Sequence, residues 1–215
     1  MSAEPTILAR GPWEPDQVEA RWIDAQFEPS GDVSSRADAK IAALRERGSP
    51  SHDGLAARLV AHHVSDGRLV LDLQPTRWAL RLVDGDASES VAAMCVARDH
   101  EGRWLAGRRA PWLASWAGHW ALGAGGAVDP FESPVHTLAR ELREEWGVVP
   151  ARMRVETLLA LPHHLVMLIG QAWLAEGSEI VPDDEHDAWA WWPADPDDWP
   201  AEADEPLRRI GRSLR

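Results

Sequence analysis

The chain has 215 residues, enough for one domain with an added part or for two small domains. Hydrophobic residues make up 45% of the chain and charged residues 27%, which excludes a wholly disordered protein. The net charge of −13 disfavours contact with phosphate backbones, so we expect no nucleic-acid partner.

The sequence also carries signals about the cellular compartment. Cys95 is the single cysteine, which excludes an internal disulfide framework and fits a reducing environment. The longest uncharged apolar run, Leu165–Ala175, has about half the length of a membrane-spanning helix. The first residues lack the pattern of a signal peptide. We therefore expect a cytoplasmic protein without a membrane partner.

The first fifty residues carry helical patterns. In Pro15–Phe27, the side chains of Val18, Trp22 and Ile23 have the spacing of a helix face. Ala37–Arg47 is a second, weaker helical candidate. Two helices are therefore expected before the first strand.

A β-hairpin is expected next. Leu55–Val64 and Arg68–Gln74 have β-like composition, and the dipeptide Asp66-Gly67 between them is a strong turn signal. Arg77–Val83 is expected to add a third strand.

The polar segment Asp84–Glu89 is the expected domain boundary. Residues 1–89 would then form an extension of helices and a hairpin, and residues 90–215 a second domain with an α/β pattern. The strands expected there are Val91–Ala97, Arg103–Arg108, Arg154–Leu161, Leu165–Leu174 and Ala188–Trp192, with short extended pieces in Ala110–Gly126 and helices at Glu132–Trp146 and near Glu202–Arg212.

The helix over Glu132–Trp146 has the clearest signals in the chain. Ser133 can cap its N-terminus, with Pro134 at the first helical position. Gly147 supplies a left-handed end. One buried stripe is expected to consist of Val135, Leu138, Ala139, Leu142 and Trp146.

Three glutamates lie beside this stripe. Glu141, Glu144 and Glu145 fall within roughly 100° of helical arc. Each pair of like charges costs about 0.2–0.5 kcal/mol, and the helix dipole disfavours anions at this end. A bound hard cation such as Mg²⁺ or Mn²⁺ would remove the conflict. The alternative is a solvated acidic face, softened by Arg140 and Arg143.

The whole segment resembles the Nudix box. The matching residues are Gly126, Glu132, Arg140, Glu141, Leu142, Glu144, Glu145, Gly147 and Val148. A chance match of this pattern is on the order of one in a million per chain, which disfavours the solvated-face reading. Two residues depart from the family pattern: Phe131 stands where glycine is usual, and Ala124 where proline is frequent. Residues 126–148 are called the box below.

The resemblance covers about residues 90–195. It implies an α/β/α sandwich with a mixed sheet, and hydrolysis of a nucleoside diphosphate linked to another group by water attack on phosphorus. It implies that Glu144 and Glu145 bind Mg²⁺ or Mn²⁺, and that Glu141 is a further ligand or the base that orients water. The carbonyl of Gly126 would complete the coordination.

The resemblance also implies a structural group, in which Glu132 and Arg140 pair to brace the box and Gly147 ends its helix. Family members often take a further acid from a later loop. Here the choice lies among Asp183, Asp184, Glu185 and Asp187, with Glu185 preferred.

Three residues are candidates for substrate binding, in each case against a plain structural role. Arg108 and Arg109 end a strand that faces the Gly- and Trp-rich loop, where they could meet phosphates or lie as ordinary surface arginines. Trp120 belongs to a loop that could border the pocket, although core packing is the commoner role of such a residue.

The leading functional hypothesis is a diphosphatase acting on a nucleotide sugar or ADP-ribose. One alternative is a nucleoside-triphosphate pyrophosphohydrolase that cleans the nucleotide pool, and another is a Nudix-fold sensor that binds a nucleotide without turnover. The run Asp53–Leu59 and the segment Leu73–Trp78 are similar to the front part of UDP-sugar-hydrolysing relatives. Such a β-rich extension could form a homodimer or wall one side of the substrate site.

Overall fold

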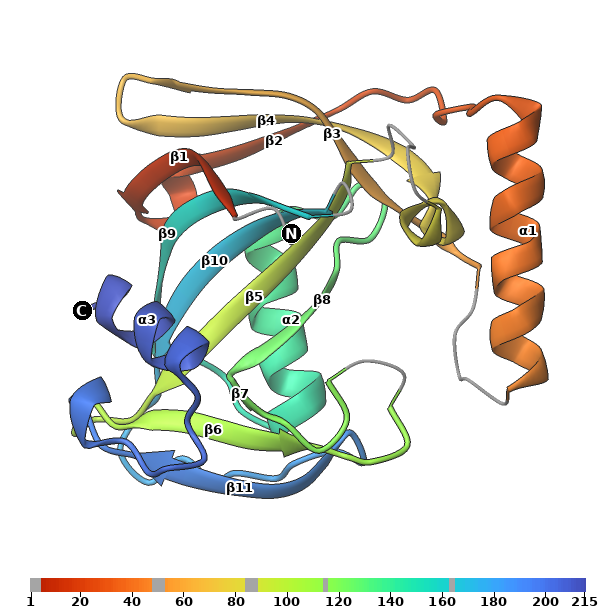
Figure 1. The fold of residues 1–215 in the computed structure, drawn as a ribbon. Coiled ribbons are helices and arrows are strands. Elements are labelled where there is room, and N and C mark those ends of the chain that lie inside the picture. Colours follow the sequence, from red (N-terminus) through yellow and green to blue (C-terminus); the bar gives the residue numbers. More distant parts are fainter. Residues whose placement is uncertain (1–4, 48–52, 84–88, 114–115, 163–164) are drawn as a thin grey trace.

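The structure is a computed structural model that describes residues 5–47, 53–83, 89–113, 116–162 and 165–215 (Figure 1). The described strands are β1 (Thr6–Trp13), β2 (Val18–Trp22), β3 (Leu55–Ser65), β4 (Arg68–Arg77), β5 (Ser90–Arg98), β6 (Trp104–Arg109), β7 (Trp120–Leu122), β8 (Ala124–Ala127), β9 (Arg152–Leu161), β10 (Leu165–Trp173) and β11 (His186–Trp192). The described helices are α1 (Gly31–Glu46), α2 (Pro134–Trp146) and α3 (Glu205–Ser213), with 3₁₀ turns η1 (Pro15–Gln17), η2 (Trp78–Leu82) and η3 (Pro196–Asp198).

All described strands belong to one mixed sheet. Its main path runs β1-β9-β10-β5-β3-β4-β2. Off this path, β6 and β8 pair with β5, and β7 and β11 pair with β6. The pair β10–β5 is parallel from Leu165↔Ser90 to Trp173↔Arg98, and β2–β4 is also parallel. The other pairs are antiparallel. The expected mixed sheet is confirmed.

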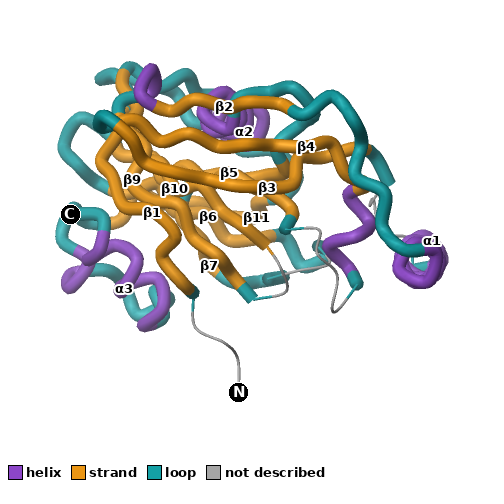
Figure 2. Tube along the Cα trace, turned by 90° about the horizontal axis from the view of Figure 1, so that it is seen from above, coloured by secondary structure: helices purple, strands orange, loops and turns teal. Residues whose placement is uncertain are grey.

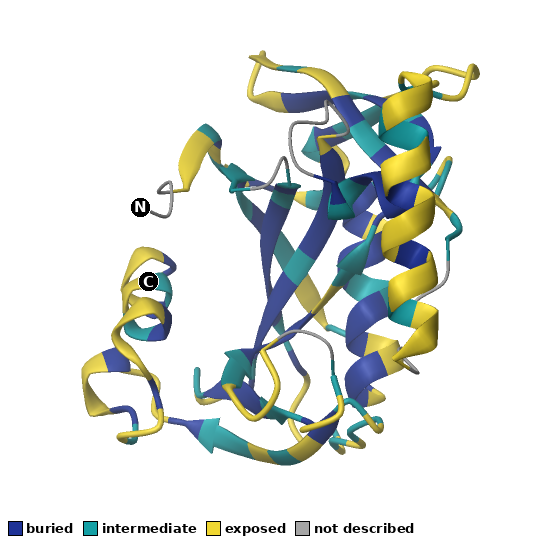
Figure 3. Ribbon diagram, turned by 45° about the vertical axis from the view of Figure 1, so that its right-hand side comes forward, coloured by how far each residue is buried: buried dark blue, intermediate teal, exposed yellow. Residues whose placement is uncertain are grey.

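Helices cover both faces of this sheet. Because successive residues of a strand point to opposite faces, β5 sends Ala93 and Cys95 to the core shared with α2. Its Val96 packs in a second core with residues of α3. Figures 1 and 2 show α2 and α3 on opposite sides of the sheet, and the buried residues coloured in Figure 3 follow the strands between them. The predicted α/β/α sandwich is therefore confirmed.

The predicted helix over Pro15–Phe27 is wrong. The chain forms β1 and β2 around η1, and these strands pair with β9 and β4. The spacing of Val18 and Trp22 explains the error, because residues four apart share a face in a strand as well as in a helix. Pairing with two strands far along the chain decides between the two structures.

Residues 1–89 are called the front part below. Outside Pro15–Phe27, the structure of the front part follows the prediction except at one point. The helix α1 and the β3–β4 hairpin are confirmed. The expected strand over Arg77–Val83 is wrong, because the chain turns into η2 after Arg77. The carboxylate of Asp53 accepts hydrogen bonds from the Arg77 side chain and from the Ala79 amide, 3.3 Å away. Ala79 and Leu80 are thereby buried against α1.

The front part and the remainder share the sheet. β1 pairs with β9, and Arg58 of β3 lies opposite Ser90 of β5. Of the expected boundary Asp84–Glu89, residues 84–88 lie outside the described residues. The division of the chain at residue 89 stays a prediction.

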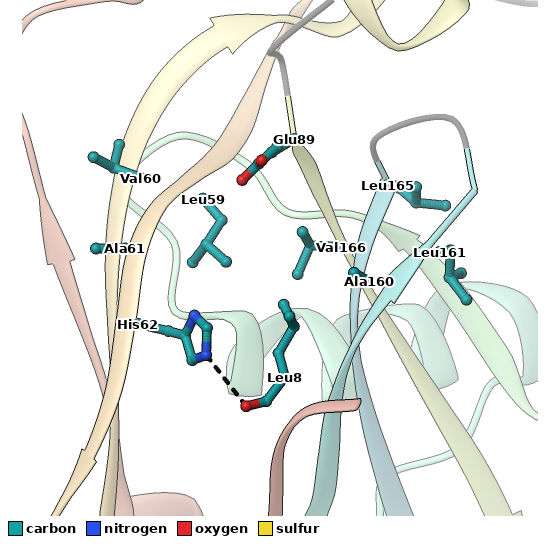
Figure 4. A pocket seen from close by; sticks show the side chains of 10 residues that line it. All are labelled: Leu8, Leu59, Val60, Ala61, His62, Glu89, Ala160, Leu161, Leu165 and Val166. Carbon is teal, nitrogen blue, oxygen red and sulfur yellow. Dashed lines mark hydrogen bonds between the residues drawn. The ribbon is translucent and has the colours of Figure 1, made fainter. Parts of the chain in front are cut away.

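A cavity of about 350 Å³ lies where β3 separates from β5 (Figure 4). Its walls are mostly aliphatic, and the side chains of His62 and Glu89 point into it. The Nε2 atom of His62 lies 3.3 Å from the carbonyl oxygen of Leu8 in β1. None of its described lining residues belongs to the box. Within the described residues, no helix is long and apolar enough to cross a membrane.

Candidate active site

The box folds into β8, a connecting loop and α2. Pro134 occupies the first turn of α2, and Gly147 ends the helix in the left-handed conformation with a φ of 68°. Ser133 is the N-cap residue as expected, but its side chain makes no capping hydrogen bond. The buried end of the helix is fastened by Trp146, whose Nε1 donates to the Gly123 carbonyl at 3.0 Å.

Glu141 lies directly against the backbone of β8. A Cβ atom placed on Gly126 would come within 2.2 Å of Glu141 Oε1, so this close approach requires a glycine. Glu141 is only 8% exposed, and Arg140 Nη1 lies 2.7 Å from its Oε1. Burial raises the pKa of Glu141, although the charge of Arg140 acts in the opposite direction.

Glu145 is buried beside other acids, an environment that disfavours its charged form. It is 7% exposed, and Gly125 N donates to its Oε1 at 2.9 Å. Burial raises the pKa of Glu145 to about 8. The Gly125 hydrogen bond lowers it, while Glu141, Glu185 and Asp183 raise it further.

Glu144 is placed differently from its two neighbours. Its side chain is 55% exposed, and its Oε2 lies 3.0 Å from Arg140 Nη1. Glu141 and Glu144 thus share one guanidinium, whereas Glu145 lies on the sheet side of the helix. The helix therefore presents two buried carboxylates and one exposed carboxylate to the same region.

Glu132 and Arg140 form a pair across the box. Arg140 donates from Nε to Glu132 Oε1 at 3.2 Å and from Nη2 to the Ala127 carbonyl at 3.1 Å. Thr137 Oγ1 donates to Glu132 Oε2 at 2.7 Å. Burial would raise the pKa of Glu132, but the hydrogen bonds from Arg140 and Thr137 hold it below its usual range. Burial would likewise lower the pKa of Arg140, but the Glu132 hydrogen bond raises it. These contacts suit the bracing role.

The later loop reaches the box as expected. The Asp183 amide donates to the Glu145 carbonyl oxygen at 2.9 Å. The preferred acid, Glu185, forms an ion pair with Arg109 at 3.3 Å. Arg108 pairs with Asp187 at 2.7 Å. Both arginine candidates thus pair with acids of residues 183–187.

Trp120 is not brought to the carboxylates. Its ring packs 5.4 Å from that of Trp192, against the second core on the α3 face of the sheet. This placement favours a packing role for Trp120.

His186 is a site residue that sequence reasoning missed. Its side chain is 2% exposed; Nδ1 lies 3.1 Å from Asp183 Oδ1 and Nε2 3.8 Å from Glu145 Oε2. The ring also packs 4.2 Å from that of Trp146. A histidine next to four candidate acids has no distinctive sequence pattern. The pairing of β11 with β6 and the packing on Trp146 bury it in the folded protein.

The site provides carboxylate and carbonyl oxygens, the donor atoms that a hard divalent cation prefers. Two carboxylates are buried at Gly125 and Gly126, and burial of such charges without a cation is unfavourable. Carboxylate and carbonyl oxygens are the ligands that Mg²⁺ and Mn²⁺ prefer. Among the described residues, no group of three acids, histidines or cysteines is placed so that it could hold a metal ion. The guanidinium of Arg140 contacts both Glu141 and Glu144.

Comparisons with known proteins find a matching family and structures of similar fold. The NUDIX domain family model matches residues 89–210. The solved structure of DR0079 from Deinococcus radiodurans is 17% identical with a TM-score of 0.51, and the match covers 75% of this chain and 100% of that chain. A MutT NUDIX hydrolase from Burkholderia pseudomallei is 23% identical with a TM-score of 0.47, over 59% of this chain and 98% of that one. No curated protein matches the chain significantly.

The family match covers more than half of the chain, so the protein belongs to the Nudix family. The expected enzyme class, a Nudix hydrolase acting on phosphoanhydride bonds, is confirmed by this family match. Enzymes of the family generally use divalent metals. The similarity to DR0079 shows that the two chains share an overall fold.

Proposed function

We propose that this protein hydrolyses the diphosphate linkage of a nucleoside-diphosphate derivative of the nucleotide-sugar or ADP-ribose type, with Mg²⁺ or Mn²⁺ as cofactor. One observation carries the proposal. The carboxylates of Glu141 and Glu145 are buried against Gly126 and Gly125 at the C-terminal end of α2, in a box with every acidic position intact. A sensor without turnover would not need these buried charges.

The residues that would hold the cation are Glu144, Glu145, Glu141 and the Gly126 carbonyl. A bound divalent cation neutralises phosphate oxygens and lowers the pKa of bound water. Among the chain's own groups, Glu141 lies in an environment that raises its pKa, which suits a carboxylate that accepts a proton from water. Glu185 is the proposed further acid, because its charge acts on Glu145 from the facing loop.

The substrate class is inferred from the surroundings of the box. The front part of the chain contributes Trp22, whose ring lies 5.2 Å from that of Phe131 inside the box. Phe131 is 61% exposed. Aromatic bulk at this place, supplied by an added part of the chain, favours a substrate with a second group beyond the diphosphate over a free triphosphate.

The test is a substrate panel with the full chain and Mg²⁺ or Mn²⁺. UDP-glucose, ADP-ribose and several nucleoside triphosphates are compared by kcat/KM, with detection of the phosphate-bearing products and Glu145→Gln as control. We expect a diphosphate-bridged substrate to be preferred by about tenfold or more, a difference of about 1.4 kcal/mol. Preference for triphosphates by that margin would establish the nucleotide-pool alternative. Tight nucleotide binding without hydrolysis would establish the sensor.

A further inference from the structure

Phe131 has a backbone conformation that its side chain disfavours. Its φ is 65°, in the left-handed region where glycine is favoured, and it stands where the family pattern has glycine. A bulky residue keeps such a conformation only where neighbouring contacts determine it. The loop between β8 and α2 must therefore be held from outside.

Trp22 supplies contacts of this kind. Its ring lies 5.2 Å from that of Phe131 at an angle of 45°, and its Nε1 donates to the Glu132 carbonyl at 3.2 Å. Trp22 itself is half-buried at the end of β2. It is fixed there by pairing with Leu73 of β4, whose carbonyl accepts a 2.8 Å hydrogen bond from Ile23 N.

A second contact joins the front part to the same loop. The amide of Ala57 in β3 donates to the Val128 carbonyl at 2.8 Å. The segment over residues 126–132, which begins in β8, is thus fastened near its start by β3 and at its end by β2. Both strands precede residue 89, outside the family match.

Glu132, whose carbonyl contacts Trp22, also contacts Arg140 inside the box. Glu132 accepts the Trp22 hydrogen bond on its carbonyl and the Arg140 hydrogen bonds on its carboxylate. Arg140 in turn lies 2.7 Å from Glu141 and 3.0 Å from Glu144. A displacement of the Glu132 backbone would therefore shift Arg140 and the two glutamates that it contacts.

We infer that Trp22 is a positioning residue of the box, which holds the loop over residues 126–132, together with Phe131, in the arrangement that its carboxylates need to bind a divalent cation. The front part of the chain is then a working part of the site. The binding of a divalent cation by these carboxylates rests on the proposed function. The hold of Trp22 on residues 126–132 does not, and hydrogen exchange tests it without metal or turnover.

The test measures Mn²⁺ binding to the metal-stripped full chain, by electron paramagnetic resonance of the free ion, and hydrogen exchange of the amides of residues 126–133. The variants are Trp22→Ala, Trp22→Phe, Phe131→Gly and the double variant Trp22→Ala/Phe131→Gly. Trp78→Ala is the matched control. Trp78 is also a half-buried tryptophan of the front part, but it packs in the core cluster that contains Ala37 and Ile41 of α1.

We expect Trp22→Ala to raise the Mn²⁺ dissociation constant about tenfold, as loss of a supporting contact around a metal site does. Exchange over 126–133 should speed up about tenfold as well. Trp22→Phe keeps a ring and should fall in between. In the double variant the effect of Trp22→Ala should shrink, because residues that act together are not additive.

Equal Mn²⁺ affinity and equal loop exchange in Trp22→Ala and Trp78→Ala would overturn the inference. If Trp22→Ala does not fold, the decision passes to Trp22→Phe and Phe131→Gly, each of which removes one of the two contacts. Wild-type Mn²⁺ affinity and exchange in both of these variants would overturn it equally.

Discussion

The amide of Gly125 donates a 2.9 Å hydrogen bond to Oε1 of Glu145, a carboxylate that is only 7% exposed. This contact joins strand β8 to the C-terminal end of α2, the two parts of the box. It stabilises the charged form of Glu145, but burial outweighs it, because the pKa of Glu145 is raised to about 8.

This pKa predicts how the metal-free protein responds to pH. The folded protein keeps a proton on Glu145 that the unfolded chain releases above its ordinary pKa of 4.5. Raising the pH from about 4.5 to about 8 should therefore destabilise the fold, by up to about 1.4 kcal/mol per pH unit from this group. Above about pH 8 this contribution should level off.

The measurement is denaturant unfolding of the metal-stripped protein at several pH values. The slope of unfolding free energy against pH should be flatter in Glu145→Gln, because its side chain does not titrate. The same slope in both proteins would show that Glu145 is not the group responsible.

Substitution of Glu144 and of Glu145 should have similar effects on kcat but different effects on metal-free stability. Glu145→Gln and Glu144→Gln should each lower kcat at least about a hundredfold, a loss of about 2.7 kcal/mol in the barrier. Glu145→Gln should also raise metal-free stability at pH 8, because it removes a buried charge. Glu144→Gln should leave that stability nearly unchanged, because its side chain is 55% exposed.

Steady-state kinetics and thermal unfolding of the two variants provide the check. Near-normal kcat in either variant, or lower metal-free stability in Glu145→Gln, would contradict the assignment.

Arg140→Ala should reduce stability and activity together. The substitution leaves the half-buried Glu132 and the buried Glu141 without their guanidinium partner, which we expect to cost about 2–3 kcal/mol. Arg140→Lys should recover only part of the loss, since one ammonium group cannot reproduce the contacts to Glu132 and the Ala127 carbonyl. Unfolding in urea, followed alongside kcat, separates the two effects. Full stability in Arg140→Ala would exclude the bracing role.

His186→Ala should leave the side chain of Glu145 less firmly positioned. The buried ring separates Glu145 from Asp183 and packs on Trp146, so its removal leaves a cavity beside the carboxylate. We expect kcat to fall about tenfold, as when a supporting group around a metal site is lost. His136→Ala is the matched control, because His136 is an exposed histidine of α2, the helix that carries Glu145. Equal kcat in the two variants would remove His186 from the site.

The sequence predicted the parts of the fold that depend on local pattern. The helix α2 follows from Pro134, the buried stripe and Gly147, which act within a few residues of one another. The β3–β4 hairpin follows from Asp66 and Gly67, both of which have positive φ.

Contacts between distant segments were beyond sequence reasoning. The segment Pro15–Phe27, which contains β2, was expected as a helix, because the pairing of β2 with β4 is not encoded in its own spacing. The contact between Trp22 and Glu132 spans 110 residues of chain. Phe131 was recognised as a departure from the family pattern, but its left-handed φ and its partner required the structure.

The most direct test of the central claim is a calorimetric titration of Mn²⁺ into the metal-stripped full chain at pH 8, with Glu145→Gln alongside. We expect Mn²⁺ to bind the wild-type protein and to bind the variant at least about tenfold more weakly. We also expect the wild-type affinity to fall as the pH is lowered below 8, because protons compete for Glu145. Equal affinity in the two proteins, or no binding to the wild type, would contradict a cation site built on the buried carboxylates of the box.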